Sequence, residues 1–151
     1  MAMSGLRDHV GYWLRRLSDE VHGRFERQLL AHGVTVAQWT VLVTIYHREA
    51  TTTTEVAQFI NIDPGAVSRL VDRLVAKGLM ARLPDPSSRR RLQLSLTPSG
   101  QALVPVLIRL ADENDAIFFG GLSAEERTGL MKLLQHLLPP SPSRSEESSD
   151  A

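Results

Sequence analysis

Five arginines have the residue type and spacing that most clearly suggest a binding chemistry. Arg69 and Arg73 stand one helical turn apart in the stretch DPGAVSRLVDRLVAKGL, and Arg89, Arg90 and Arg91 are consecutive in DPSSRRRLQLSLT. A guanidinium is permanently charged, and its planar set of N–H donors matches the oxygens of phosphates and other paired acceptors. These residues therefore indicate a surface that binds a polyanion.

The charge of the chain is concentrated around these arginines. The 151 residues include 17 basic and 17 acidic side chains, so the total charge indicates no polyanionic partner. Residues 63–91 nevertheless carry seven Lys and Arg against three Asp, a net charge of +4, and the rest of the chain carries −4. A neutral protein with one basic segment can bind a polyanion locally while its other surfaces repel it.

Other chemistries have little support. The chain contains no cysteine, which excludes disulfides, thiolate zinc sites and thiol-based redox sensing. No nucleophile elbow, glycine-rich phosphate loop or metal-ligand spacing connects the Ser, His, Asp and Glu residues. We therefore expect no catalytic residue, no metal and no cofactor, and we keep an enzyme only as the weaker alternative.

Hydrophobic periodicity and capping residues predict the helices that must position the arginines. From Leu6 to Leu30, apolar residues recur at steps of three and four, which predicts one long helix that ends at Gly33. The capping-box pairs that predict the starts of three later helices are Thr35 with Gln38, Thr52 with Glu55, and Ser123 with Glu126.

The basic segment itself reads as a helix followed by a hairpin. Asp63 and Pro64 supply a capping carboxylate and a proline at the first helical position. The stretches LMARL and RLQLSL read as two strands joined by PDPSS. In the second strand, Leu92, Leu94 and Leu96 are expected to face inward. Another helix begins after Thr97-Pro98 and extends to about residue 119.

The order of these elements is that of a winged helix: a short helix, a tight turn, a second helix and a hairpin, with further helices on both sides. The predicted fold is mainly α with a small β-hairpin. Residues 1–138 form a single domain, of which residues 35–97 are the winged-helix lobe. Residues 139–151 are rich in Pro, Ser and acid, which predicts a disordered tail.

In this arrangement the basic helix is a DNA-recognition helix. The small residues Pro64 and Gly65 at its start let backbone amides approach a phosphate. Arg69 can reach a guanine edge in the major groove, Arg73 a phosphate, and Ser68 either. Taken alone, the two arginines could be ordinary solvated helix charges, but the turn before them and the hairpin after them favour DNA.

The three consecutive arginines lie on the hairpin, or wing, whose tip is expected over the flanking minor groove. A narrow minor groove has a negative potential that attracts arginine. Neighbouring strand residues point to opposite faces, so Arg89, Arg90 and Arg91 cannot share one role. We expect one to insert, one to hold the backbone or brace the hairpin, and one to stay solvated. A solubilising charge run is the alternative.

The stretch TTTTEVAQFINIDPGAVSRLVDRLVAKGLMARLPDPSSRRRLQLSLTPSG resembles the MarR family of bacterial transcription regulators, and the resemblance extends over residues 6–138. The wing of that family usually reads aspartate, any residue, arginine. Here Ser88 stands at the aspartate position and Arg90 matches the arginine. The salt bridge that usually shapes the wing is therefore in question, and Asp85 or a serine hydroxyl could replace it.

The resemblance implies a homodimer in which the helices of residues 6–32 and 98–138 interleave. The long apolar stripe of the first helix and the leucines of the last one support this independently, because a small winged domain needs less apolar surface to cover itself. Two-fold symmetry then predicts a palindromic DNA operator with half-sites about 34 Å apart. Repression by blocking polymerase is the usual outcome in similar proteins.

The resemblance also implies a small-molecule effector, commonly an aromatic acid, in a crevice between the dimerisation helices and the winged lobe. Candidates are His9, Trp13 and Arg16, at one-turn spacing on the first helix, with Trp39 and Val43 on the second. An arginine and a histidine beside tryptophans could receive a carboxylate attached to a ring. Alternatively, both tryptophans are core residues and Arg16 is an intersubunit or surface charge.

These observations predict a dimeric, sequence-specific DNA-binding regulator, most simply a repressor that an aromatic acid releases from double-stranded DNA. A winged-helix module that binds protein instead is the alternative, although an acidic recognition face would be expected for it. No apolar run approaches the roughly 20 residues needed to span a membrane, and no signal peptide is visible. We therefore expect a cytoplasmic protein without a membrane partner.

Overall fold

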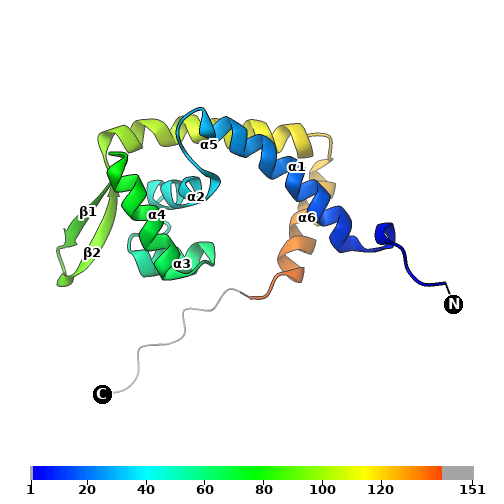
Figure 1. The fold of residues 1–151 in the computed structure, drawn as a ribbon, viewed down its shortest axis with the longest axis horizontal. Helices are drawn as coiled ribbons and strands as arrows, with labels where there is room; N and C mark the ends of the chain where they lie inside the picture. The colour runs from blue at the N-terminus through cyan, green and yellow to red at the C-terminus, as the bar shows by residue number, and fades with distance from the viewer. Residues whose placement is uncertain (1, 141–151) are drawn as a thin grey trace, which may run out of the picture.

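The computed structural model describes residues 2–140 (Figure 1), so most of the tail expected at residues 139–151 lies outside the described residues. The elements in chain order are η1 (Leu6–Asp8), α1 (Val10–Leu30), α2 (Val36–Tyr46), α3 (Thr53–Ile60), α4 (Pro64–Ala76), β1 (Met80–Asp85), β2 (Ser88–Leu96), α5 (Pro98–Phe119) and α6 (Ala124–Leu137). The predicted fold class, mainly α with one antiparallel hairpin, is confirmed.

The long helices α1 and α5 form one side of the molecule and the winged lobe forms the other. In Figure 1, α5 spans the molecule, the lobe of α2, α3, α4 and the hairpin lies beneath its N-terminal half, and α6 turns back below its C-terminal end. Asn114 of α5 is buried and donates to the carbonyl oxygen of Val21, while Arg24 donates to Oδ1 of Asn114 over 3.0 Å. These hydrogen bonds fix α1 against α5.

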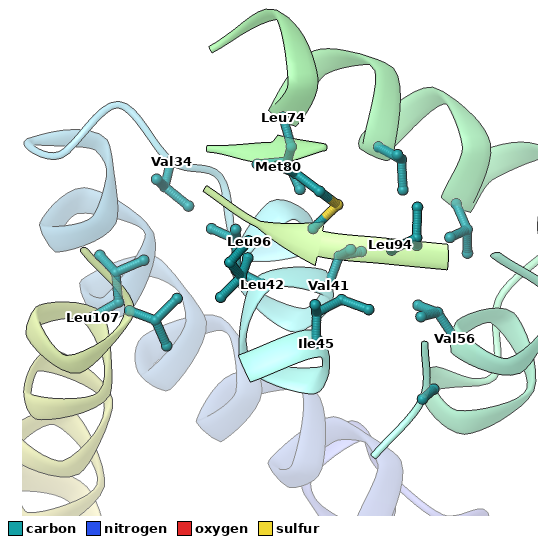
Figure 2. Close-up of a cluster of buried hydrophobic side chains, with 14 of the residues drawn as sticks. Val34, Val41, Leu42, Ile45, Val56, Leu74, Met80, Leu94, Leu96 and Leu107 are labelled. Atoms are coloured by element: carbon teal, nitrogen blue, oxygen red, sulfur yellow. The ribbon is translucent and has the colours of Figure 1, made fainter. Parts of the chain in front are cut away.

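A single apolar core holds the lobe together and joins it to α5 (Figure 2). Val41, Leu42 and Ile45 of α2 lie at its centre, between strand β2 and α5. Side chains from α3, α4 and both strands complete it: Val56, Val67, Val71, Leu74, Met80, Leu94 and Leu96. The helix–turn–helix and the wing therefore form one packed unit.

The N-terminal helix is shorter than expected. His9 has extended backbone angles (φ −97°, ψ 125°), so a 3-10 turn at residues 6–8 is separated from α1, which begins at Val10. The turn is closed locally, because the Asp8 carboxylate accepts from the N–H of Gly5 over 2.8 Å. The expectation of one helix from Leu6 is therefore wrong, and His9 does not share a helical face with Trp13.

Most of the predicted helix starts are confirmed, with one change of partner. Reciprocal capping boxes form at the starts of α2 and α6. At the start of α3, the hydroxyl of Thr52 accepts from the N–H of Glu55 as predicted. The Glu55 carboxylate, however, accepts from the N–H of Thr51 over 2.9 Å, one residue earlier than a reciprocal box requires.

The hairpin extends beyond the core. Its strands are longer than predicted and leave only Pro86 and Ser87 between them. Leu94 and Leu96 are buried, but Leu92 is 52% exposed, so the expectation that all three leucines face inward is wrong for Leu92. Leu92 is exposed because it lies in the half of the hairpin nearer the tip, which extends beyond the core.

Candidate nucleic-acid interface

The tight turn between α3 and α4 is built from local backbone preferences. Asn61 ends α3 in the left-handed conformation (φ 57°, ψ 51°), which asparagine tolerates better than most residues. Two residues later, the Asp63 carboxylate accepts from the N–H of Ala66 over 3.1 Å, and Pro64 takes the first helical position. The short turn brings the start of α4 to the surface of the lobe.

The structure places the predicted residues of α4 on its outer side. Val67, Val71 and Leu74 are buried against the core, which leaves the opposite side to solvent. Its exposed members include Pro64, Gly65, Arg69, Asp72 and Arg73, and Ser68 is half-buried. The Arg69 guanidinium lies over the start of the helix, with Nη1 3.7 Å from the position that a Cβ on Gly65 would occupy.

In the wing, where Ser88 stands at the usual aspartate position, hydrogen bonds between Asp85 and Ser87 close the turn. Oδ1 of Asp85 accepts from the N–H and the hydroxyl of Ser87, over 2.9 and 2.7 Å. These hydrogen bonds, followed by the charge of Arg91, lower the pKa of Asp85 from its ordinary value of 3.8. The turn is thus closed by Asp85 and Ser87, and the replacement of the usual salt bridge to Arg90 stays a prediction.

The wing arginines lie in β2, close to this turn. Arg90 and Arg91 are both exposed, and they lie where the strand pairing is irregular, because Pro84 pairs with Leu92 whereas Asp85 pairs with Ser88. The backbone of Arg89 precedes them in the same strand. The N–H of Arg90 donates to the hydroxyl of Ser88 over 3.4 Å, a weak brace at the start of the strand.

The wing and α4 are connected by an ion pair that the sequence analysis did not identify. Arg82 of β1 binds the Asp72 carboxylate of α4, with 2.5 Å between the nitrogen and oxygen. On the other side, the N–H of Leu94 donates to the carbonyl oxygen of Thr51, which attaches β2 to the loop before α3. The recognition helix and the hairpin therefore belong to one rigid surface.

Unlike Arg82, four other arginines of the basic segment form no ion pair within the described residues. Within residues 2–140, no carboxylate lies within 4.0 Å of Arg69, Arg73, Arg90 or Arg91. These four guanidinium groups are exposed and available to an external anion. An exposed surface with four arginines on a helix and a hairpin, none of them in a salt bridge within this part of the chain, can bind phosphates and base edges together.

The candidate effector residues fall into two groups within one chain. Nε1 of Trp13 donates to the carbonyl oxygen of Arg7, and the Arg16 guanidinium lies 5.8 Å from the centre of a Trp13 ring. Trp39 packs edge-on against Phe25, with ring centres 5.7 Å apart. Twelve residues separate the two sites along α1, about 18 Å of helix.

Each group has its own surroundings. His9 and Trp13 are exposed near the start of α1, and the His9 ring contacts the carbonyl oxygen of Gly5. Trp39 and Val43 are half-buried at the edge of the core. The five residues thus form no single pocket within one chain, and their role as a receptor stays a prediction. Residues 2–140 contain no cluster of three His, Cys, Asp or Glu side chains that could hold a metal ion, and none of their helices could cross a membrane.

Comparisons with known proteins agree with this geometry. A model described as MarR family matches residues 34–92. The multiple antibiotic resistance protein MarR of Escherichia coli is 34% identical over 107 residues, which are 70% of this chain and 74% of that protein. The crystal structure of a mutant of E. coli MarR with operator DNA has a TM-score of 0.76 at 30% identity and covers 86% of this chain and 94% of that one.

Two further structures are of proteins that bind small molecules. CouR from Rhodococcus jostii, bound to p-coumaroyl-CoA, has a TM-score of 0.79 at 28% identity, covering 88% of this chain and 94% of that one. BpsR from Bordetella bronchiseptica, whose DNA binding is regulated by 6-hydroxynicotinic acid, has a TM-score of 0.77 at 29% identity, covering 89% and 96%. From the helix–turn–helix, the wing and these relationships, the chain belongs to the MarR family.

Proposed function

We propose that this protein is a dimeric, sequence-specific DNA-binding regulator that represses transcription. The observation that carries the proposal is the surface on which α4 and the wing present Arg69, Arg73, Arg90 and Arg91, none of which forms a salt bridge within residues 2–140. A winged-helix module that binds protein is disfavoured, because an acidic partner would have to compete with DNA for the same cations. The operator-bound structure of E. coli MarR supports the choice of DNA.

In the proposed complex, α4 enters the major groove with its N-terminal half foremost. The exposed amides around Pro64 and Gly65 approach a phosphate, helped by the positive end of the helix dipole. Arg69 reads a guanine edge, Arg73 binds a phosphate, and Ser68 contacts either. The helix thus supplies both base recognition and part of the electrostatic affinity.

The wing reaches the minor groove beside this site. One of Arg89, Arg90 and Arg91 enters the narrow groove, where the negative potential is strongest. The three arginines are consecutive in the irregular part of the hairpin, and we expect the other two to hold the backbone or brace the hairpin and to stay solvated. This contact gives a preference for A/T flanks without hydrogen bonds to bases.

The dimer rests on apolar side chains that one chain leaves exposed. On α1 these include Val10, Leu14 and Leu17, which are 77%, 51% and 42% exposed. On α6 no residue is buried, and its exposed apolar residues include Leu133 and Leu137. Exposed apolar side chains that recur along two helices are typical of an interface between proteins, and a two-fold axis would set two recognition helices about 34 Å apart.

We further propose an aromatic-acid effector that binds at His9, Trp13, Arg16, Trp39 and Val43 and releases the DNA. The BpsR ligand, 6-hydroxynicotinic acid, is an aromatic acid and supports this class, and the CouR ligand, p-coumaroyl-CoA, is a thioester that also contains an aromatic ring. Since one chain separates these residues into two groups, a single site would need both chains of the dimer. A thermal-shift series with benzoate, salicylate and 4-hydroxybenzoate tests the proposal, and an Arg16→Ala variant should lose any stabilisation. Failure of all three to shift melting or release DNA would reject the effector class.

Salt dependence of binding to the promoter of the protein's own gene tests the DNA-binding function. A dimer that neutralises about 6 to 10 phosphates loses on the order of 10³- to 10⁵-fold in affinity between 50 and 200 mM salt. We expect a loss of this size in a gel-shift titration. Binding that is absent, or that does not respond to salt, would contradict the proposed function.

A further inference from the structure

Lys77 lies at the C-cap of α4, at the opposite end of the helix from Pro64. Its ammonium donates to the carbonyl oxygen of Gly33 and to Oε1 of Gln38, the latter over 2.8 Å. Within residues 2–140, no carboxylate lies within 4.0 Å of this ammonium. The charge of Lys77 is therefore committed to two neutral oxygens of the same chain.

The two acceptors belong to the junction between α1 and α2. Gly33 closes the turn that follows α1, with φ at 71°. Gln38 lies in the first turn of α2, is only 3% exposed, and uses the same Oε1 to accept from the N–H of Thr35 over 3.2 Å. One ammonium thus joins the end of α1, the start of α2 and the end of α4 by charge-assisted hydrogen bonds, which are about twice as strong as neutral ones.

We infer that Lys77 is a positioning residue that fixes the orientation of the recognition helix relative to α1, and thereby the spacing of half-sites that the dimer accepts. The inference rests on the proposed DNA-binding function and dimer. It assigns Lys77 a role within the protein, although the residue belongs to the basic segment and could have been counted as a phosphate contact.

Other contacts of α4 leave this orientation less well determined. Val67, Val71 and Leu74 pack on the core and hold α4 against it, but the hydrophobic effect that drives this burial is non-directional. The ion pair between Asp72 and Arg82 joins α4 to the wing, not to α1 or α2. Among the described residues, the side-chain hydrogen bonds between α4 with its C-cap and the α1–α2 junction all come from Lys77.

The length of α4 converts a small change at Lys77 into a large one at the DNA. Its 13 residues span about 20 Å, because each residue adds about 1.5 Å of rise. A tilt of roughly 10° about Lys77 would move Pro64 by about 3.4 Å, the rise of one base pair. Loss of the Lys77 hydrogen bonds should therefore weaken the preference for one half-site spacing more than it weakens the recognition of bases within a half-site.

The experiment compares the full-length chain with Lys77→Met on duplexes that differ only in spacing. The wild-type protein first selects its preferred inverted repeat from random duplexes, and one base pair is then added or removed between the half-sites. We expect the wild type to bind the selected spacing roughly 3- to 30-fold more tightly than the shifted ones. For Lys77→Met this ratio should approach one, with base preference within each half-site retained.

Two measurements separate positioning from a phosphate contact. Loss of a phosphate contact lowers the slope of log affinity against log salt by about one per chain, whereas a loosened helix leaves the slope unchanged. Lys77→Arg should restore most of the spacing preference, since its guanidinium can reach the same acceptors.

Gln38→Met removes one acceptor of the Lys77 ammonium and keeps Lys77 itself. If Lys77→Met does not fold, the spacing preference of Gln38→Met tests the inference instead. It should reduce the spacing preference as Lys77→Met does, and the double variant should show no further reduction. A wild-type spacing preference in the single variants, a lower salt slope, or additive effects in the double variant would overturn the inference while leaving the proposed function intact. If the wild type itself selects no duplex, both fail.

Discussion

Six of the seven cations of residues 63–91 have described side chains, and these six divide into two groups according to their partners. Arg82 and Lys77 are engaged with Asp72 and with oxygens of the α1–α2 junction, so they organise the protein. The exposed arginines of α4 and β2 lack such partners among the described residues. Charge counting along a sequence cannot make this division, because the partners lie 10 to 44 residues away.

Arg69→Ala and Arg73→Ala should differ in what they change. Loss of a base contact at Arg69 should cost about 1–3 kcal/mol per half-site and relax preference at one base pair. Loss of a phosphate contact at Arg73 should weaken binding equally on all sequences and reduce the salt slope by about one per chain. Anisotropy titrations on operator variants across salt measure both. Identical behaviour of the two variants would contradict the assigned orientation of α4.

The wing turn gives a prediction about pH. Because Ser87 hydrogen bonds lower the pKa of Asp85, these bonds should persist above the ordinary value of 3.8 and be lost as pH falls through the lowered pKa. The Ser87 amide resonance, followed by NMR, should therefore titrate with a midpoint below 3.8. Asp85→Asn should keep the turn at neutral pH, because its amide oxygen can accept the same bonds. A midpoint at or above 3.8 would show that the turn does not depend on them.

The helices and strands were largely predictable because their signals are local. Capping hydroxyls, Asp63-Pro64 and the alternation in β2 each act within a few residues, and they located nearly every element. The errors arose where a tertiary feature or a competing local contact decided. Leu92 alternates correctly but lies beyond the core, and the extended backbone at His9 follows a closed turn that apolar periodicity does not reveal.

The junction between the wing and α5 provides a stability prediction at this level. A Cβ on Gly100 would lie 2.1 Å from the carbonyl oxygen of Leu79, so the first turn of α5 packs directly on the backbone before β1. Gly100→Ala should lower the free energy of unfolding by about 1–3 kcal/mol or more, because backbone must move. Its exposed neighbour, in Gln101→Ala, should change it by less than about 0.5 kcal/mol. Urea unfolding of both variants provides the measurement, and equal stabilities would mean that the junction is looser than described.

At the scale of the whole molecule, the single chain exposes apolar residues on α1 and α6, as we expect for one subunit of the proposed dimer. Residues of α1 and α6 that would form a core in a larger protein are exposed here, including Leu14 and Leu133. The sequence pattern predicted this surplus of apolar surface. Trp13 lies near the start of α1, whereas Trp39 of α2 packs against Phe25, further along α1. The sequence pattern could not predict this separation, because it depends on how the helices pack.

Leu14→Glu should convert the dimer to monomers. A charge at a buried interface is costly, and each monomer would hold only one recognition helix, so operator affinity should fall with the dimer. Ala37→Glu, an exposed position in the first turn of α2 and outside both dimerisation segments, should leave both properties unchanged. Sedimentation equilibrium and gel shifts on the same samples test this, and a dimeric Leu14→Glu with full affinity would exclude the α1 surface as the interface.

Selection of bound duplexes from a random pool by the full-length protein tests the central claim most directly. Two recognition helices related by a two-fold axis should enrich an inverted repeat whose half-sites are centred about 10 base pairs apart, on one face of the duplex. Flanks rich in A/T should mark the wing contacts. The account would be contradicted by a pool that stays random, or by one enriched for a single half-site bound by one chain. Either result would show that the protein does not bind successive grooves with a symmetric pair of helices and wings.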